Sequence, residues 1–163
     1  MESDTKAMLQ CLENQRGHVL GILDGLPEDA LLRAVLPSGW SSAALIQHLA
    51  LDVERFWFRV VVAGETDLED ASDSSESAWI MSPDARAADV FELYRKEIEQ
   101  ANDIIANTPL DAEPRYWPAF FGEWRLPDLR AILLHVIAET ACHAGHLDAV
   151  RELIDGRTWL ILT

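Results

Sequence analysis

The chain has 163 residues, with 28 acidic and 13 basic side chains and a formal net charge of −15. This charge argues against binding to nucleic acid or to an anionic membrane surface, because both would repel the protein. The length and an apolar fraction of 49% predict one globular domain over residues 1–163. The two cysteines lie far apart and the acidic N-terminus has no leader pattern, so we expect a soluble cytoplasmic protein.

The first half of the chain carries two stretches of helical period. The first helix is expected over residues 4–24, where apolar residues recur at spacings of three, four and seven, and a Gly-Leu-Pro sequence marks its end. A second helix is expected after a capping serine, either Ser41 or Ser42, and ends at Gly64. Its apolar residues also follow the helical period.

An acidic, serine-rich segment separates the two halves. Residues 65–77 contain almost nothing to bury, and we expect them to form a mobile surface loop. The sequence Ser82-Pro83-Asp84 then has the pattern of a helix start, with a cap, a proline and an acid in the first turn. It predicts a third helix that ends near Asn107.

The longest predicted helix follows an aromatic connector. Residues 116–124 contain five aromatic side chains, and such a connector is either a lid on the core or a wall of a substrate site. The fourth helix is expected from near Pro127 to Asp155, with a glycine stop at Gly156. Four long amphipathic helices predict an all-α protein with the architecture of a four-helix bundle.

The fourth helix carries a narrow stripe of polar residues on its apolar side. At about 100° per residue, His135, Glu139, His143 and His146 fall within roughly 80° of one another. The predicted solvent side lies opposite and holds Arg130, Asp148, Glu152 and Asp155. Three imidazoles and a carboxylate beside a bundle core are costly unless they share a partner.

A divalent metal ion is the most economical partner for these groups. Glu139 and His143, one helical turn apart, can both reach a single ion, and a third ligand must come from another helix. His48 is the better candidate for it, because it borders an apolar face, whereas His18 lies in a more polar turn. This donor set favours zinc over nickel, manganese or iron, and His135 or Asp52 can orient a ligand.

Each of these residues also has a simpler interpretation. His48 or His135 alone could be an ordinary core histidine, and Glu139 with His143 could be a helix-surface pair. The spacing H-x-x-x-E-x-x-x-H differs from the H-E-x-x-H of zinc peptidases and gives peptidase chemistry no support. Cys142 borders the stripe and is expected to be a small packing residue.

The sequence resembles the DinB-like metalloprotein superfamily, and within it the actinobacterial branch related to mycothiol-dependent transferases and maleylpyruvate isomerase-like enzymes. The resemblance rests on GWS at 39–41, HLA at 48–50 and VERFWF at 53–58. In the fourth helix it rests on ETACHAGHLD at 139–148 and RELIDG at 151–156.

The resemblance implies a DinB-like four-helix bundle with up-down-down-up connectivity. It also implies three metal ligands, one histidine from the second helix and an i, i+4 pair from the fourth, which correspond here to His48, Glu139 and His143. The first position of that pair is often histidine in the superfamily and is glutamate here. His146 stands where glutamine is frequent, so it is an optional ligand or an orienting group.

The functional hypothesis is a metal-dependent S-transferase that joins a low-molecular-weight thiol, of the mycothiol type, to a small electrophile. The choice of thiol is implied by the resemblance alone. No side chain besides the ligands and His146 stands out as a general base, so no catalytic residue is assigned. The alternatives are a non-enzymatic bundle with a structural or vestigial metal site, and a hydrolase that uses zinc-bound hydroxide.

Large rings on the second helix bear on association. On an α-helical wheel Phe56 points inward, whereas Trp57 and Phe58 fall on the outer faces. Their cover could be the aromatic connector, the C-terminal tail with Trp159, or a second copy of the chain. Two-fold pairing is the commonest form of association, and we therefore expect a homodimer.

Overall fold

The computed structural model describes residues 3–68 and 78–160. Regular secondary structure in these ranges is helical, apart from one isolated bridge between Ala34 and Ser41. Most of the predicted acidic loop, residues 69–77, lies outside the described residues. No helix within the described ranges is both long and apolar enough to cross a membrane.

The helices in chain order are α1 (Ser3–Leu23), α2 (Glu28–Leu32), α3 (Ser42–His48), the π-helix η1 (Leu49–Val62), the short 3₁₀-helix η2 (Thr66–Leu68), α5 (Ala87–Asn107), the 3₁₀-helix η3 (Ala119–Phe121) and α6 (Leu129–Asp155). The predicted first, second and fourth helices are confirmed to within a few residues, although the second is split into α3 and η1. The short α2 was not predicted. The predicted start of the third helix at Ser82 is wrong, because the N–H of Ala85 closes a turn on the Ser82 carbonyl and α5 begins only at Ala87.

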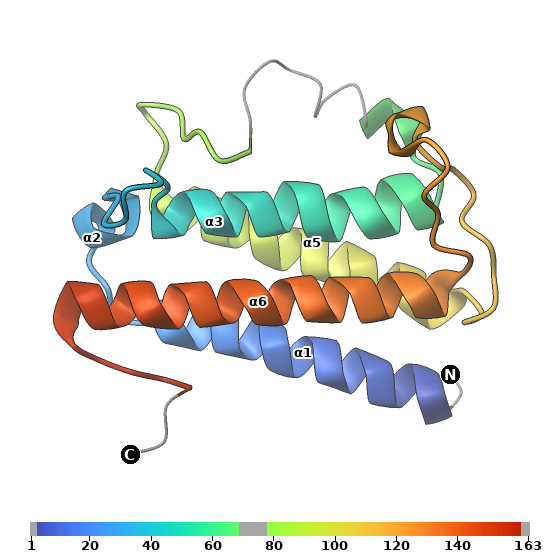
Figure 1. Ribbon diagram of the computed structural model, residues 1–163, viewed down its shortest axis with the longest axis horizontal. Helices are drawn as coiled ribbons and strands as arrows, with labels where there is room; N and C mark the ends of the chain where they lie inside the picture. Colours follow the sequence, from blue (N-terminus) through green and yellow to red (C-terminus); the bar gives the residue numbers. More distant parts are fainter. Residues whose placement is uncertain (1–2, 69–77, 161–163) are drawn as a thin grey trace.

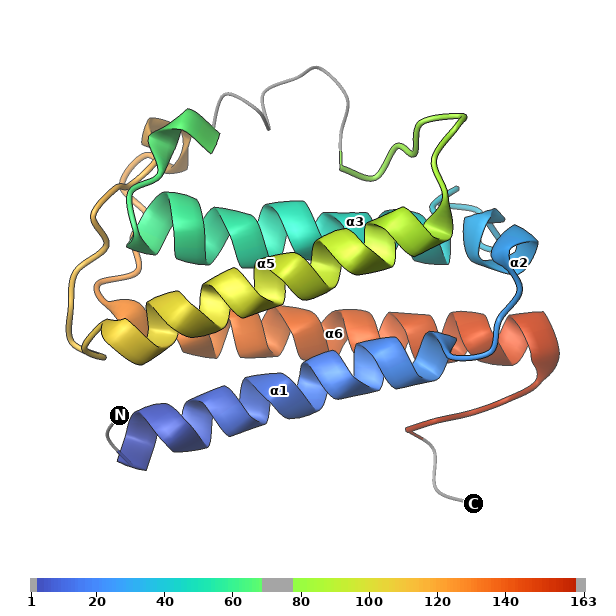
Figure 2. The same cartoon turned by 180° about the vertical axis from the view of Figure 1, so that it is seen from behind.

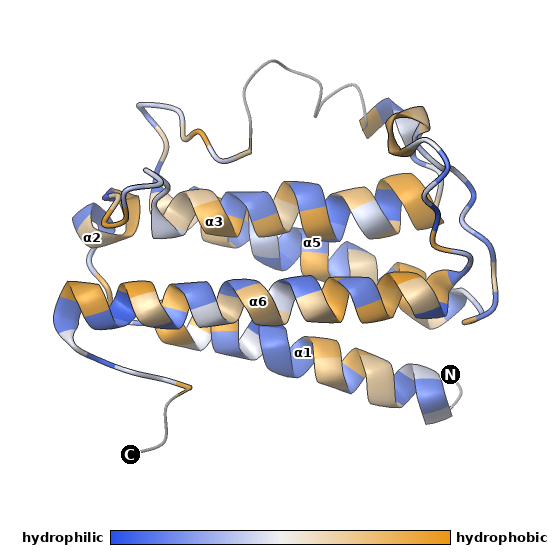
Figure 3. Ribbon diagram, in the orientation of Figure 1, coloured by the Kyte–Doolittle hydropathy of each residue, from blue (hydrophilic) through white to orange (hydrophobic). Residues whose placement is uncertain are grey.

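The long helices α1, α5 and α6 and the rod formed by α3 and η1 lie roughly side by side (Figures 1 and 2). Along the chain, α1 and α6 run in one direction, and the α3–η1 rod and α5 run in the other (Figure 1). Helix α1 packs against α6, and α5 packs against η1. Polar and apolar stretches alternate along each rod, as expected for helices that share a core (Figure 3).

Local sequence signals set the ends of the two helices that matter most for function. The Ser41 side chain accepts a hydrogen bond from the Ala44 N–H at 3.2 Å and caps α3. The Asp128 carboxylate does the same for the Ala131 N–H at 2.8 Å and caps α6. Helix α6 ends at Gly156, whose φ of +76° is the left-handed conformation that glycine adopts without strain.

The π-helical form of η1 changes which side chains face the core. Near its end the Ala63 N–H bonds to the Phe58 carbonyl, five residues back. A π-helix turns each residue by roughly 80° rather than 100°, so Trp57 returns to the His48 side and Phe58 follows it inward. Both rings are buried, and the prediction that they face outward is therefore wrong.

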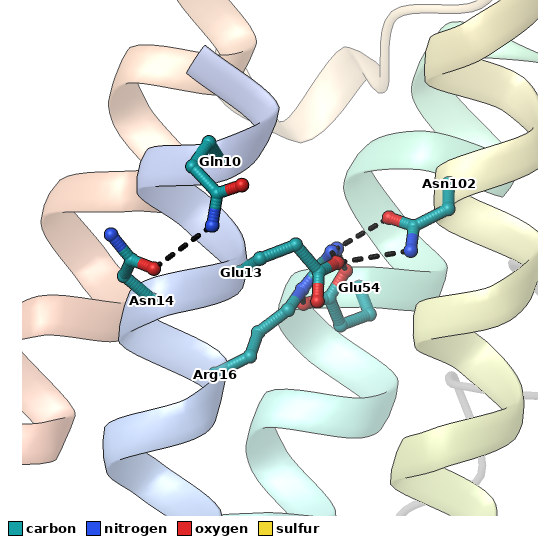
Figure 4. A network of polar contacts seen from close by, with 6 residues as sticks. All are labelled: Gln10, Glu13, Asn14, Arg16, Glu54 and Asn102. Carbon is teal, nitrogen blue, oxygen red and sulfur yellow. Dashed lines mark hydrogen bonds and ion pairs between the residues drawn. The ribbon is translucent and has the colours of Figure 1, made fainter. Parts of the chain in front are cut away.

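A charged cluster lies inside the core between α1, η1 and α5. The Arg16 guanidinium donates to both carboxylate oxygens of Glu54, at 2.7 and 2.5 Å, and both side chains are buried. Its remaining nitrogen donates to Glu13 and to the Asn102 side chain, at 2.6 and 2.7 Å (Figure 4). The cluster ties η1, the segment that directly follows His48, to two neighbouring helices.

The tail after α6 folds back over α6 and α1. Asp148, predicted on the solvent side of α6, is buried and accepts backbone hydrogen bonds from Trp159 and Leu160 at 2.7 and 2.9 Å. That prediction is wrong because the wheel takes no account of the returning chain. The Trp159 ring lies over Gly21 of α1 and donates to Nδ1 of His18 at 3.0 Å.

Candidate metal site

Three side chains predicted as metal ligands lie together between the α3–η1 rod and α6. His48, Glu139 and His143 each offer one nitrogen or oxygen atom, and these three atoms lie within 4.8 Å of one another. His48 is the last residue of α3, and the other two residues face it from successive turns of α6. The rings of His48 and His143 meet edge to face, with centroids 5.0 Å apart.

His48 presents one free nitrogen to this cluster. Its Nδ1 lies 2.9 Å from an oxygen of the Asp52 carboxylate, which fixes the proton on Nδ1. Its Nε2 is buried, has no hydrogen-bond partner among the described residues, and lies 3.9 Å from Oε1 of Glu139. A buried acceptor nitrogen without a donor is unfavourable by itself and is well placed to bind a cation.

His143 is held from both sides of its ring. Its Nε2 lies 3.1 Å from the same Glu139 oxygen, and its Nδ1 lies 3.4 Å from Nδ1 of His146. Burial lowers the pKa of His143, the neighbouring His48 lowers it further, and Glu139 opposes this shift. The neutral imidazole that results is the form that binds a metal ion.

The spacing of the three atoms fits one divalent ion. Ligand atoms bonded at about 2 Å in a tetrahedral arrangement lie roughly 3.3 Å apart. The two separations to the Glu139 oxygen, 3.1 and 3.9 Å, bracket that value, and the third separation is within 4.8 Å. The two histidine side chains are largely enclosed, whereas the Glu139 side chain is 38% exposed. The group can therefore hold a metal ion whose remaining coordination positions open on the Glu139 side.

A family model places the chain independently of this geometry. The model of the mycothiol S-transferase family matches residues 7–156. The chain belongs to the mycothiol S-transferase family. This is a DinB-like family, so the resemblance expected from the sequence is confirmed. No curated protein and no solved structure matches the chain.

The remaining histidines of this member of the mycothiol S-transferase family lie at different places in the structure. Nδ1 of His146 lies 3.4 Å from Nδ1 of His143, the ring nitrogen that does not face Glu139, and His146 is not in the ligand group found among the described residues. His135 lies outside the cluster, with its ring 4.8 Å from that of Trp57. His18, the less favoured candidate, is on α1 and accepts the hydrogen bond from Trp159. Of the three predicted orienting residues, Asp52 contacts His48 through its carboxylate and His146 contacts His143. Within the described ranges, the ring contacts of His135 are instead with Trp57 and Trp124.

Trp79 belongs to the site and was missed by the sequence analysis. Its ring stacks on His48, with centroids 4.3 Å apart and planes 22° apart, and lies 5.8 Å from the His143 ring. The Gln47 side chain donates to the carbonyls of Ala78 and Ile80 and so holds the backbone on both sides of the tryptophan. Trp79 lies in a connector without helical period, and no sequence signal pairs it with His48.

The aromatic connector covers the next stretch of the same two rods. Trp57 contacts three of its rings, those of Trp117, Phe121 and Trp124, with centroids 5.7 to 6.2 Å away. The indole N–H of Trp117 donates to the Trp124 carbonyl at 3.0 Å and closes the connector on itself. The connector is therefore a lid over Trp57, as in the first of the two interpretations. Cys142 is exposed on α6, so the expectation that it is a small packing residue is wrong.

Proposed function

We propose that the protein is a metal-dependent S-transferase that joins a low-molecular-weight thiol of the mycothiol type to a small electrophile. His48, Glu139 and His143 are the protein ligands of a divalent ion, and zinc suits two neutral imidazoles and one carboxylate best. The observation that carries the proposal is the buried Nε2 of His48, which has no hydrogen-bond partner among the described residues and faces the Glu139 carboxylate and the His143 ring. The family supplies the reaction class.

When bound, a divalent ion lowers the pKa of a thiol that coordinates it, and this is the chemistry it would supply. The Asp52 carboxylate keeps the proton of His48 on Nδ1 and directs Nε2 into the cluster. Nδ1 of His146 lies 3.4 Å from Nδ1 of His143, so one of these two rings can donate a hydrogen bond to the other. These contacts fix the two rings before substrates arrive.

The transfer itself takes place on the open, Glu139 side of the cluster. The thiolate sulfur of the substrate forms a bond to the electrophilic carbon, and the leaving group departs from that carbon with its bonding electron pair. The protein contributes position, because both partners are held next to the same cluster and their encounter is no longer bimolecular. The buried side of the cluster limits the approach of water.

Metal analysis of protein purified without a histidine tag tests the proposed ligands. We expect about one divalent ion per chain in the wild type and almost none in His143→Ala, because three protein ligands define the site. His135→Ala is the matched control on the same helix and should keep its metal. Equal and negligible metal in the wild type and in His143→Ala would contradict the proposal.

Activity is tested by incubating the protein with candidate thiols and monochlorobimane. We expect a rate of bimane conjugation above that of the metal-stripped protein for at least one low-molecular-weight thiol. The same rate with and without metal for every thiol would favour a non-enzymatic bundle. Metal content and activity are separate readouts, so a site that binds metal without transferring a thiol would be recognised.

Three further features belong to this proposal. The helix directions in Figure 1 support the up-down-down-up topology of a DinB-like bundle. The pairing of two chains stays a prediction, and it loses the argument from Trp57 and Phe58 because both rings are covered within the chain. A cytoplasmic location likewise stays a prediction.

A further inference from the structure

A small open cleft lies directly beside the cluster of His48, Glu139 and His143. It has a volume of about 480 Å³ and is lined by Ser38, Gly39, Trp40, Trp79 and Ile80. Trp79 belongs both to this lining and to the ring stack on His48. A molecule in the cleft would therefore be separated from His48, a proposed metal ligand, only by the Trp79 ring.

The shape of the cleft favours a flat ligand. The rings of Trp40 and Trp79 meet at an interplanar angle of 60°, with centroids 6.2 Å apart, and form two aromatic surfaces of the cleft. Gly39 leaves the space beside it open, because a Cβ built there would meet no atom within 4 Å. The volume is in the range of sites for small molecules, and aromatic rings bind planar partners through their faces and edges.

One wall of the cleft is held in place by the residue next to His48, and the other by a turn of the backbone. Gln47, the residue before His48, donates to the Ala78 carbonyl at 2.7 Å and to the Ile80 carbonyl at 3.2 Å. The opposite wall is fixed by a turn in which the Gly39 N–H bonds to the Leu36 carbonyl at 3.0 Å. The position of the cleft relative to His48 is thus set by α3 itself.

The charges around the cleft select against anions. The lining residues carry no charge, and the charged side chains that contact the adjoining histidines, Asp52 and Glu139, are both acidic. An anionic ligand would lose its hydration without gaining a net counter-charge, because the two carboxylates balance the charge of the proposed divalent ion. An uncharged ligand avoids this penalty and still buries apolar area against the two indoles.

We propose that this cleft binds the body of the electrophile, and that the preferred electrophile is an uncharged planar aromatic molecule. The inference rests on the proposed function for the reaction and on the cleft alone for the binding. The exposed rings at the other end of the α3–η1 rod are the competing location. Phe120 is 69% exposed there, but it packs into the connector lid against Phe56 and Phe121.

Binding is measured without turnover, using N-phenyl-1-naphthylamine as an uncharged fluorescent probe that carries a planar naphthalene ring. We expect Trp40→Ala to raise the Kd of this probe by about tenfold. This is the usual scale for the loss of one aromatic partner and its buried area. Phe120→Ala, the matched control on the competing surface, should bind as the wild type does. The anionic relative 1-anilinonaphthalene-8-sulfonate should bind wild type at least about tenfold more weakly than the neutral probe.

A second variant guards against misfolding of Trp40→Ala. Ile80 is exposed, so Ile80→Asp should fold. The new carboxylate in the cleft should weaken the binding of the neutral probe as well. Equal binding of the probe by wild type, Trp40→Ala and Ile80→Asp would overturn the inference. So would loss of binding in Phe120→Ala alone, or a preference for the sulfonate.

Transfer kinetics separate this inference from the proposed function. With the active thiol, Trp40→Ala should raise KM for monochlorobimane about tenfold and leave the rate with iodoacetamide, which has no ring, within about twofold. Equal effects on the two electrophiles would refute the cleft while leaving the S-transferase intact. Conversely, if no thiol supports transfer but the probe still distinguishes the variants, the cleft stands and the proposed reaction fails.

Discussion

Replacing Arg16 by methionine tests the buried ion pair that joins α1 to η1. The change removes both hydrogen bonds to Glu54, whose carboxylate is 0% exposed, and leaves that group without a counter-charge. Methionine fills much of the space of the aliphatic part of the arginine side chain. The main effect of the substitution is therefore the loss of the charge and not the creation of a cavity. The pair anchors η1, which carries Asp52, the carboxylate that orients His48.

The expected loss follows from the burial of the pair. Breaking a fully buried ion pair by removing one partner destabilises a protein by about 3–5 kcal/mol. The bond from Arg16 to Glu13 adds at most about 1 kcal/mol, because Glu13 is partly exposed and keeps its hydrogen bond from Asn102. For a chain of this size the melting temperature should fall by roughly 6–20 °C.

The loss should also depend on pH. Burial raises the pKa of Glu54, and the Arg16 guanidinium opposes that rise. Arg16→Met removes the guanidinium that opposes this rise. The folded variant therefore keeps the Glu54 carboxyl protonated to a higher pH than the unfolded chain does. The contribution of Glu54 to the stability of the variant is then fully present below the usual carboxyl pKa of 4.5, and it is lost as the pH rises from there through the raised pKa of the folded protein.

Urea unfolding followed by circular dichroism measures these differences. The control is the double variant Arg16→Met/Glu54→Leu, which removes both charges and should lie within about 1 kcal/mol of the wild type or above it. Two results would refute the reasoning. One is a loss below about 1 kcal/mol in the single variant, and the other is a double variant as unstable as the single one.

Three smaller changes test other parts of the structure. Asp52→Asn should weaken metal binding about tenfold or more, measured by competition with a chelator, because the amide no longer fixes the proton of His48. Tyr94→Phe should change stability by less than about 1 kcal/mol near neutral pH, because the buried hydroxyl has no hydrogen-bond partner among the described residues. Burial holds the pKa of Tyr94 well above 10, so the wild type, unlike the variant, loses stability as the pH rises past the unfolded value of 10. Gly21→Ala should release the C-terminal tail and speed its removal by trypsin, because the new Cβ would lie 2.5 Å from the Trp159 ring.

Each of these changes has its own control. Asp89→Asn, on α5 away from the cluster, should leave metal affinity unchanged, and equal affinities in all three proteins would contradict a role for Asp52. Absorbance at 295 nm follows the two tyrosines, and ionisation of both near pH 10 in the folded protein would contradict the burial of Tyr94. In a Trp159→Ala background, Gly21→Ala should no longer change the rate of trypsin cleavage.

The sequence by itself determined the helices and most of the candidate metal site. Helical period and local caps placed α1 and α6 to within a few residues, because these signals act within one or two turns of chain. Glu139 and His143 share a face for the same reason. His48 followed by elimination among few histidines and agreed with the resemblance, and the cluster brings all three together.

Other features were decided only by the tertiary structure. The period of η1 departs from 3.6 residues per turn, so an α-helical wheel misplaced Trp57 and Phe58. A charge pattern does not show which acid will meet an arginine 38 residues away, and so the burial of Glu54 could not be read from it. Trp79 reaches His48 because the connector that contains it folds onto α3, where Gln47 holds its backbone. This contact depends on the packing of the chain and not on a local spacing in the sequence.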